Sequence, residues 1–215
     1  MNHNAYFITR SGRTIAYRDD YHDPAQFDIN DIATSLAGQP RFLGHTCKPY
    51  SVAEHCMRVA AIGPDSQRLQ ALMHDAAEAY TGDIPTPLKA AVPELREIGR
   101  RIDAAIAERF SIAPTRATVD RADLTMLLTE ARDLCDPRMA AALAESYPDV
   151  RPMPAKIEPL PNEPRLIAHL FLQFFEGAKL YPEGKQRRIW NDLTTALRWD
   201  WSRLDHEDDI REAAG

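Results

Sequence analysis

Four side chains from three separate stretches of the sequence have the types and spacing expected of a metal site. His55 ends the segment Ser-Val-Ala-Glu-His, His74 and Asp75 are adjacent, and Asp123 ends the segment Asp-Arg-Ala-Asp. Two imidazoles and two carboxylates suit a borderline or hard divalent cation. A site of this kind that keeps one position open can activate a water molecule. The pattern therefore indicates metal-assisted hydrolysis.

Glu78 is the candidate acid or base beside this set. It follows His74 by four positions and Asp75 by three. Positions three and four apart are neighbours on one face of a helix, so the sequence predicts that the three side chains share one flank. Polar groups among so many apolar neighbours need partners. A bound cation would satisfy His74 and Asp75 together, and Glu78 could then exchange a proton beside it.

The spacing alone leaves the fourth ligand open. Asp120 and Asp123 both lie in a helix predicted over residues 118–134. Asp123 has apolar neighbours on its own side, which suggests a buried acid. Asp120 equally fits a charge that favours the N-terminal end of the helix dipole. A lone histidine on an apolar face is usually a core residue, so the metal hypothesis depends on the whole set.

The first histidine must be held by a helix that begins just before it. Ser51 and Glu54 form a capping box, in which the serine caps the amide of the glutamate and the glutamate reaches back. His55 then lies in the first helical turn, and Gly63 with the following proline ends the helix.

The other elements follow from apolar periodicity and from proline and glycine stops. Asp65 or Ser66 is expected to cap the helix that carries the His-Asp pair. Residues 83–87 and 148–164 are expected to be a stiff loop and an extended proline-rich loop, and residues 5–17 a short hairpin. Helices are predicted at 28–37, 65–80, 93–110, 118–134, 164–178 and 184–203.

The fold class predicted from these elements is all-α, a helical bundle with a short N-terminal β-hairpin. A length of 215 residues fits one domain. Within it we expect an N-terminal segment (1–27), a helical core (28–145), and a proline-rich loop with C-terminal helices packed on that core (146–215).

The order His, His-Asp, Asp on successive helices resembles the HD-domain metal-dependent phosphohydrolases. The local sequences Ser-Val-Ala-Glu-His-Cys, His-Asp-Ala-Ala-Glu-Ala-Tyr-Thr-Gly-Asp-Ile-Pro-Thr-Pro-Leu-Lys and Asp-Arg-Ala-Asp are similar to the branch that contains bacterial 5′-deoxynucleotidases. Phage dATP triphosphohydrolases resemble that branch closely. The similarity extends over about residues 28–135, which would make the bundle an HD domain.

The resemblance implies a role for each candidate residue. One divalent transition ion (cobalt, manganese, zinc or similar) would be held by His55, His74, Asp75 and Asp123, which selects Asp123 over Asp120. The acid-base carboxylate maps onto Glu78 and a second functional acid onto Asp83. The arginine that binds the 5′-phosphate in the family maps onto Arg41. Phe42 follows it where the nucleotidase branch usually has tryptophan, so deoxyribose selectivity does not carry over directly. His45 and Lys89 are further polar candidates for phosphate contact.

The implied activity is hydrolysis of a phosphate ester bond of a deoxynucleotide. We favour a 5′-deoxynucleotidase, which converts a dNMP to a deoxynucleoside and phosphate. A dNTP triphosphohydrolase, which releases triphosphate, is the alternative within the family. It needs more basic contacts along the phosphate tail, for which the candidates are Arg58, Arg96, Arg100 and Arg101.

An alternative of another class is a non-catalytic, metal-stabilised nucleotide-binding module. Mere binding does not require Glu78 and Asp83, so their presence weighs against it. The sequence does not distinguish the two acid-base roles of these residues, nor the base preference of the site. The physiological metal also depends on availability.

The composition limits the partners. The net charge of −6 argues against a protein that coats nucleic acid, and no apolar run approaches the length of a membrane span. The odd number of cysteines, three, and the absence of a secretory signal at the N-terminus favour a reducing, cytoplasmic location. The expected partner is a small deoxynucleotide, and the resemblance favours a homodimer.

Overall fold

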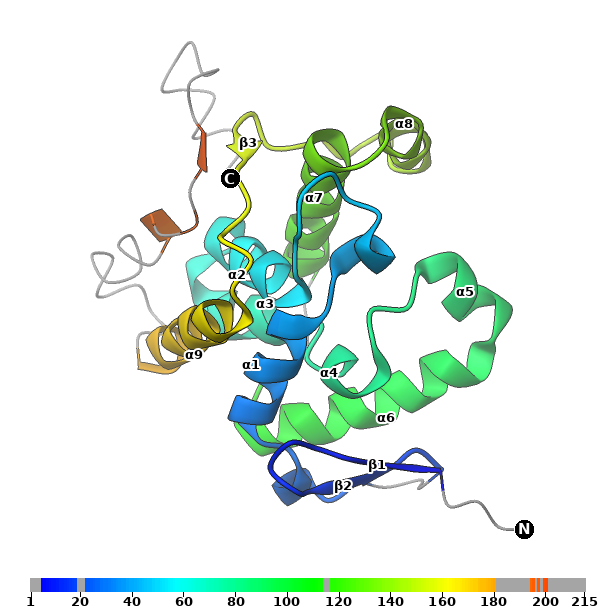
Figure 1. Ribbon diagram of the computed structural model, residues 1–215, viewed down its shortest axis with the longest axis vertical. Coiled ribbons are helices and arrows are strands. Elements are labelled where there is room, and N and C mark those ends of the chain that lie inside the picture. The colour runs from blue at the N-terminus through cyan, green and yellow to red at the C-terminus, as the bar shows by residue number, and fades with distance from the viewer. Residues whose placement is uncertain are drawn as a thin grey trace.

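The computed structural model describes residues 5–18, 22–113, 117–180, 194–195, 197 and 199–200, and shows a helical bundle with a hairpin at one end (Figure 1). The α-helices are α1 (Ile29–Gly38), α2 (Val52–Ile62), α3 (Arg68–Met73), α4 (Glu78–Thr81), α5 (Thr86–Ala91), α6 (Pro93–Phe110), α7 (Ala117–Leu134), α8 (Pro137–Ser146) and α9 (Pro164–Leu180). Short 3-10 helices are η1 (Pro24–Gln26), η2 (Arg41–Gly44) and η3 (Asp65–Gln67). The predicted all-α class is confirmed.

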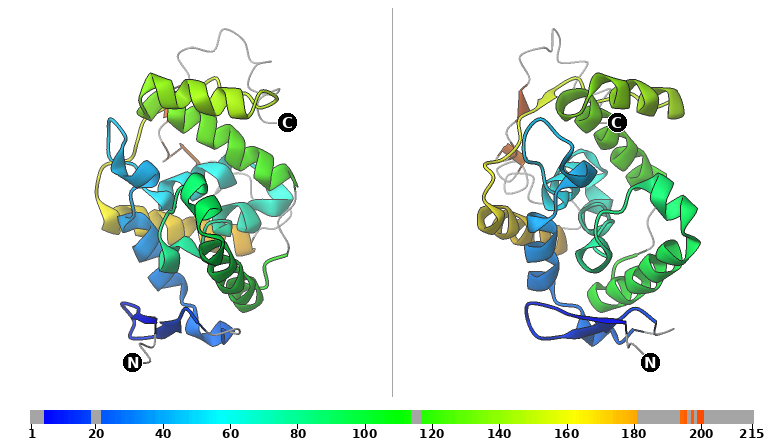
Figure 2. Two further views of the ribbon diagram at one scale, coloured as in Figure 1. Left: turned by 90° about the vertical axis from the view of Figure 1, so that its right-hand side faces the viewer. Right: turned by 45° about the vertical axis from the view of Figure 1, so that its right-hand side comes forward.

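Helix α2 lies at the centre of the bundle. It contacts α1, α3, α7 and α9, and the two rotated views show it enclosed by these elements (Figure 2). Residues 52–60 are buried without interruption. A helix that is buried on all sides has no solvent face for its polar residues, so each of these must find a partner inside the protein.

Two of these polar residues form a buried ion pair. The Arg58 guanidinium donates to Glu54 Oε1 at 2.7 Å and to the carbonyl of Glu158 at 2.9 Å. The Glu54 carboxylate also accepts from the backbone amide of Leu160 at 3.1 Å. Ser51 caps the amide of Glu54 as predicted, but the return half of the capping box is wrong, because Glu54 is occupied by these other partners. Because the pair bonds to the backbone of Glu158 and Leu160, it links the proline-rich segment to α2.

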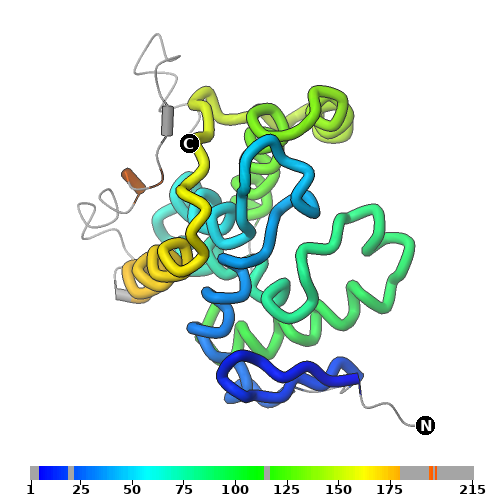
Figure 3. Tube along the Cα trace, in the orientation of Figure 1, coloured from blue at the N-terminus to red at the C-terminus, as the bar shows by residue number. Residues whose placement is uncertain are grey.

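Helix α9 supplies the other large part of the core. Its buried residues Ile167, Phe171 and Phe174 lie at helical spacing, and the helix packs against α1. It lies on the opposite side of the molecule from α5, as the backbone trace shows (Figure 3). Helix α5 and the loop before it therefore remain free of the main core and border the site described below.

Several predicted elements have the expected bounds. The hairpin pairs β1 (Tyr6–Ile8) with β2 (Thr14–Ala16) in antiparallel register, and its turn uses Gly12 at φ 83°, which favours glycine. The Asp28 carboxylate caps α1 by accepting from the amide of Asn30. The helices predicted at 93–110 and 118–134 correspond to α6 and α7.

The helix predicted over residues 65–80 is wrong in its continuity. It begins as η3 without a side-chain cap and continues as α3. At residues 74–77 it loses the regular α-helical hydrogen-bond pattern, although His74 and Ala77 keep right-handed helical dihedrals, and α4 then begins. The amides of Ala76 and Glu78 bond to carbonyls three residues back, Met73 and Asp75, both at 3.0 Å. The chain thus departs from a regular helix where the adjacent His-Asp pair lies.

Other predictions need correction after residue 82. The stiff loop ends at Pro85, because Thr86 and Pro87 begin α5, and proline is well tolerated in a first helical turn. Helix α8 was not predicted, although Asp136 caps it by accepting from the amide of Arg138.

The proline-rich loop contains one short strand. β3 (Lys156–Ile157) pairs antiparallel with β4 (Trp199–Asp200). The helix predicted at 184–203 is therefore wrong at residues 199–200, and most of its remaining length lies outside the described residues. Within the described part of the chain, no helix is long and apolar enough to cross a membrane.

Candidate functional site

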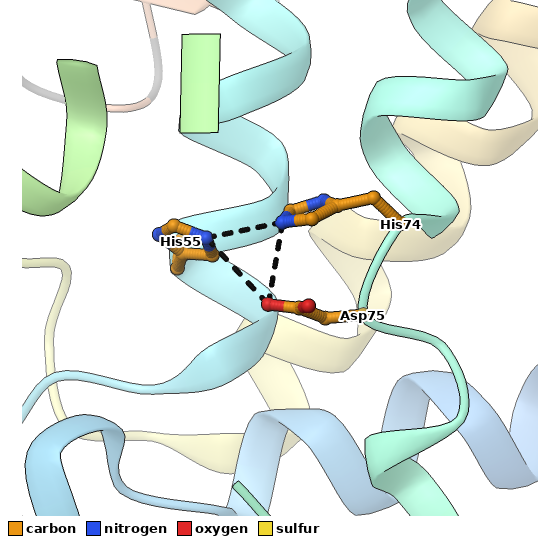
Figure 4. Close-up of side chains that lie close together, drawn as sticks. All are labelled: His55, His74 and Asp75. Carbon is orange, nitrogen blue, oxygen red and sulfur yellow. Dashed lines mark hydrogen bonds and ion pairs between the residues drawn. The ribbon is translucent and has the colours of Figure 1, made fainter. Parts of the chain in front are cut away.

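The four predicted metal ligands converge from three elements. His55 comes from the first turn of α2, His74 and Asp75 from the break after α3, and Asp123 from α7. His55 Nε2 lies 3.3 Å from His74 Nε2 and 3.1 Å from Asp123 Oδ1. Asp75 Oδ2 lies 3.3 Å from His74 Nε2 and 3.6 Å from His55 Nε2. Figure 4 shows the two imidazoles and Asp75 facing one another.

The hydrogen bonds behind the two imidazoles test whether a cation fits between them. His55 Nδ1 lies 2.6 Å from Glu130 Oε1, and His74 Nδ1 lies 2.8 Å from the carbonyl oxygen of Ala71. Both partners are acceptors, so each Nδ1 carries a proton and each Nε2 of a neutral ring presents a lone pair. Two lone pairs at 3.3 Å repel one another unless a proton or a cation lies between them.

The separations of the donor atoms also fit a coordination sphere. Ligand atoms about 2.0–2.2 Å from one ion are about 3.0–3.6 Å from each other. The two imidazole Nε2 atoms lie 3.1 to 3.7 Å from each other and from the nearest Asp75 and Asp123 oxygens. His55, His74 and Asp75 form the set whose ligand atoms are all mutually close, and Asp123 joins it through its contacts with the two imidazoles. Oxygen and imidazole nitrogen donors together suit a borderline divalent transition ion, so these residues fit the metal.

When no metal ion is bound, protons and ion pairs compensate the charges of the candidate ligands. Burial alone would lower the pKa of His74, but the charge of Asp75 and the hydrogen bond with Asp123 raise it well above its usual value. Burial alone would raise the pKa of Asp75 and of Asp123, yet the two histidines lower both well below the usual range. A cation must therefore displace protons from the imidazoles, and acid weakens its binding.

Glu78 lies beside the ligands at one wall of a cavity. It is 6% exposed, and its Oε1 accepts from Lys89 Nζ at 2.9 Å. Burial and the charges of Asp75 and Asp83 raise the pKa of Glu78 to about 8, against the lowering effect of Lys89. A carboxylate tuned to neutral pH is suited to proton exchange with a substrate or water.

The cavity opens from the ligands toward α6. Its volume is about 240 Å³, and its walls include His74, Asp75, Glu78, Lys89, Arg96 and Asp103. Asp103 and Arg96 belong to α6. Arg96 was among the candidates for a phosphate tail, whereas Asp103 was not singled out from the sequence. A ligand bound in this cavity would touch Glu78 and the His-Asp pair at its inner end.

Arg41 approaches the cluster from a strained turn in η2. Phe42 and Leu43 both adopt φ 54°, and Gly44 adopts φ 79°. Non-glycine residues in this region cost about 1 kcal/mol or more each, and such strain often occurs at functional sites. The amide of Arg41 bonds to the carbonyl of Tyr50 at 2.9 Å, which closes the loop.

Three acids surround the Arg41 guanidinium. Its Nη1 lies 3.6 Å from Asp75 Oδ2 and 3.9 Å from Asp83 Oδ1, and its Nε lies 3.5 Å from Glu130 Oε2. Burial alone would lower the pKa of Arg41, but these carboxylates raise it above its usual value. The ring of Phe42 stacks under the guanidinium at 5.6 Å. A fixed cation therefore lies next to the ligand set.

The structure brings most of the predicted residues together, with exceptions. His45 is exposed at the end of η2, and no contact of its side chain with the cluster is found among the described residues. Asp120 is exposed, whereas Asp123 is half-buried rather than fully buried. Arg58, a candidate for a phosphate tail, is enclosed in the core by its ion pair with Glu54.

Glu130 on α7 is a site residue that sequence reasoning missed. It is fully buried and touches both His55 and Arg41. Burial alone would raise the pKa of Glu130, but the charges of His55 and Arg41 lower it. The available signal was weak: Glu130 follows Asp123 by seven positions, two helical turns, on the same helix.

The metal-free protein is expected to be less stable at pH 8.5 than at pH 6. A folded state that holds a proton more tightly than the unfolded chain loses that advantage as pH rises through the folded pKa. The pKa of Glu78 is raised from 4.5 to about 8, and the pKa of His74 is raised as well. Both groups therefore lower the stability of the folded protein as the pH rises. At about 1.4 kcal/mol per pKa unit and about 2–4 °C per kcal/mol, we expect a melting temperature about 5 °C lower at pH 8.5.

Thermal unfolding followed by circular dichroism after treatment with a chelator would measure this difference. The Glu78→Gln variant should reduce it. Asp75 and Asp123, whose pKa values are lowered, lose their contribution only in strong acid. A melting temperature that is constant or rises between pH 6 and 8.5 would contradict the assignment.

Comparison with known proteins shows similarity to one family. A family model described as 5′-deoxynucleotidase YfbR-like matches residues 43–121. The match contains His55, His74, Asp75, Glu78 and Asp83. It begins inside η2, after Arg41 and Phe42, and ends before Asp123, so these three residues of the site lie beyond it.

Individual relatives extend the similarity. The uncharacterized protein YfdR of Escherichia coli (strain K12) is 44% identical over 126 residues, which are 57% of this chain and 71% of that protein. An uncharacterized protein of Rhodobacter capsulatus is 36% identical over 139 residues, 58% of this chain and 70% of its own length. A 5′-deoxynucleotidase of Vibrio parahaemolyticus is 32% identical over 84 residues, 32% of this chain and 43% of that protein.

Proposed function

Because the chain belongs to the YfbR-like 5′-deoxynucleotidase family of HD-domain phosphohydrolases, we propose that it removes the phosphate from deoxynucleoside 5′-monophosphates in a reaction that depends on a divalent metal ion. It is thus a phosphoric ester hydrolase of the HD superfamily. The observation that carries this proposal is the convergence of His55, His74 and Asp75 within ligand distance of one another. Their position between Glu78 and Arg41 adds an acid-base group and a phosphate-binding cation.

The metal would be held by His55, His74, Asp75 and Asp123. We propose one transition ion, with cobalt, manganese and zinc as candidates. When bound, such an ion activates water and offsets charge that develops on a phosphoryl group.

Arg41 would bind the phosphate. Its guanidinium is held in place by Asp75, Asp83 and Glu130, and its planar fork can donate two parallel hydrogen bonds to phosphate oxygens. Phe42, stacked under the guanidinium, would contact the sugar. Lys89 is 31% exposed in its side chain and binds Glu78, so we propose that it orients that carboxylate and also reaches the substrate.

Two carboxylates would transfer the protons of the reaction. In the hydrolysis, the water oxygen forms a bond to phosphorus and the bond from phosphorus to O5′ breaks. We propose that Glu78, which lines the cavity, accepts the proton of the water. Asp83, next to Arg41, would supply a proton to the departing O5′. Together the two transfers leave a deoxynucleoside and inorganic phosphate.

The arrangement of the arginines favours the monophosphate over the triphosphate. Arg58 is buried in its pair with Glu54. Arg101 donates to the carbonyl of Tyr17, and Arg100 is paired with Glu97 at 2.7 Å although it borders the cavity. Of the four candidates for a phosphate tail, Arg96 and Arg100 line the cavity and two do not. The basic contacts for a triphosphate are therefore reduced.

A substrate panel tests this function. The protein loaded with manganese or cobalt is expected to release inorganic phosphate from dNMPs with a kcat/KM at least about 10-fold above that for triphosphate release from dNTPs, because 10-fold corresponds to about 1.4 kcal/mol, roughly one lost charge-assisted contact. Protein stripped with a chelator is the control and should be inactive. Release of triphosphate alone would favour the dNTP reaction. Metal binding with neither reaction would favour a non-catalytic nucleotide-binding module.

A further inference from the structure

Glu130 is a buried carboxylate that the proposed function uses only at Arg41, although it also contacts His55. It lies on α7, and its side chain has no exposed surface. Its carboxylate contacts His55, Arg41 and Tyr50, and the first two belong to the proposed metal and phosphate sites. A charge in such a position is costly to bury unless it is paired and hydrogen-bonded.

One oxygen of Glu130 is directed at the metal ligand. Oε1 lies 2.6 Å from His55 Nδ1 and accepts from the hydroxyl of Tyr50 at 2.8 Å. The His55 and Glu130 side chains are both completely buried, so water does not compete for this bond. The contact keeps the proton of His55 on Nδ1 and turns Nε2 toward His74. An acceptor behind a ligating imidazole fixes its tautomer and its orientation.

The other oxygen is directed at the arginine. Oε2 lies 3.5 Å from Arg41 Nε, and neither atom has a hydrogen-bond partner in the part of the chain that the structure describes. Both atoms are out of contact with solvent. This ion pair is therefore what compensates the buried Nε, and it leaves the terminal nitrogen Nη1 of Arg41 turned toward Asp75 and Asp83.

We propose that Glu130 is a positioning residue for both halves of the site: Oε1 orients the imidazole of His55 for the metal, and Oε2 holds the guanidinium of Arg41 for the phosphate. This inference rests on the proposed function, because it takes His55 as a metal ligand and Arg41 as the phosphate-binding group. It adds that one carboxylate on α7 fixes the distance between the His55 imidazole and the Arg41 guanidinium. Metal affinity and phosphate affinity should then depend on the same side chain.

A second buried carboxylate provides the comparison. Glu54 directly precedes His55 and is 1% exposed, but its oxygens bind Arg58 and the amide of Leu160. These partners lie in the core and in the proline-rich segment rather than in the cluster. Glu54 and Glu130 thus share burial and charge and differ in what they touch.

The Glu130→Gln variant tests the proposal. Glutamine has the same shape but one acceptor oxygen and one donor nitrogen, so it cannot accept from His55 and from Arg41 at the same time. We expect manganese affinity, measured by calorimetry, to fall at least about 10-fold, as is usual for partners behind metal ligands. The affinity of the manganese-loaded protein for inorganic phosphate should also fall. Glu54→Gln, the matched control, should lower the melting temperature and leave both affinities within two-fold of wild type.

The tautomer of His55 provides a readout that needs neither metal nor turnover. Nitrogen NMR of the metal-free wild-type protein with labelled histidine should show His55 protonated on Nδ1, and the proton should be protected from exchange. A His55 ring without a proton on Nδ1 would overturn the proposal, even if Glu130→Gln fails to fold.

The outcomes separate this inference from the proposed function. If the wild type releases phosphate from dNMPs and Glu130→Gln retains both affinities within two-fold, the positioning role is wrong and the function stands. If Glu54→Gln reduces the affinities as much as Glu130→Gln, the effect is one of core stability and the positioning role is again wrong. If the wild type binds manganese but releases no phosphate, the proposed function fails, while the metal affinities and the tautomer still decide the role of Glu130.

Discussion

The His74→Ala variant is expected to bind divalent metal at least about 100-fold more weakly than the wild type and to lose phosphate release to background. Changes behind a ligand already cost 10–100-fold, and this change removes a ligand itself. His74 Nε2 lies 3.3 Å from both His55 Nε2 and Asp75 Oδ2. The remaining donors would be one imidazole and two carboxylates, with a gap where the second imidazole stood.

The variant should still fold, because the His74 side chain is not part of the hydrophobic core, and its Nδ1 bonds only to the nearby carbonyl of Ala71. Metal analysis of the purified protein and calorimetry with manganese would measure the loss. His169→Ala on α9 is the matched control, since it removes an exposed histidine remote from the ligand set. Equal manganese affinity in wild type and His74→Ala would disprove the metal site.

The Glu78→Gln variant is expected to retain metal and substrate binding while kcat falls by about 10²- to 10⁴-fold, the usual contribution of a general acid-base group. Glutamine preserves the shape of the side chain and an acceptor for Lys89 Nζ, which lies 2.9 Å from Glu78 Oε1. What it removes is the ability to take up a proton near neutral pH. That ability follows from the raised pKa of Glu78, about 8, which burial and the nearby acids produce.

The measurement is steady-state kinetics on dNMPs together with metal content. A fall in kcat with KM within a few-fold of wild type would support proton transfer by Glu78. Glu145→Gln on α8, an exposed position, should behave as wild type. Unchanged kcat in Glu78→Gln would transfer the acid-base role to another group, with Asp83 the first candidate. This variant also separates an enzyme from a binding module, because a module has no turnover to lose.

The regular helices and the candidate metal ligands could be identified from the sequence because their signals are local. Pro93 begins α6 and the apolar spacing of α7 continues to Leu134, so the bounds follow from propensity and periodicity. The His-Asp pair and the residues around it form one continuous motif. His55 lies four positions after a serine cap. Each of these signals lies within one element of the chain.

The break after α3 could not be predicted in the same way. Residues 65–80 have an unbroken apolar pattern, and periodicity alone favours one helix. The structure instead uses three-residue hydrogen bonds around His74 and Asp75. The packing of Ala76 and Ala77 in the core and the approach of His74 to His55 on another helix decide this geometry, and neither is encoded in local spacing.

Residue type and spacing in the sequence determined the fold class, the candidate ligands His55, His74 and Asp75, and the candidate acid-base group Glu78, since they report what one segment can form. The choice of Asp123 over Asp120 and the role of Asp83 came from the resemblance to the HD-domain phosphohydrolases. Only the tertiary structure decided which polar residues belong to the site. Arg58 and Glu130 are both charged residues on helices, yet one closes a core ion pair and the other contacts His55 and Arg41. Glu130 meets His55 across 75 positions of the chain. Burial makes such a pairing necessary, because a charge removed from water must be compensated by whichever groups the fold brings beside it.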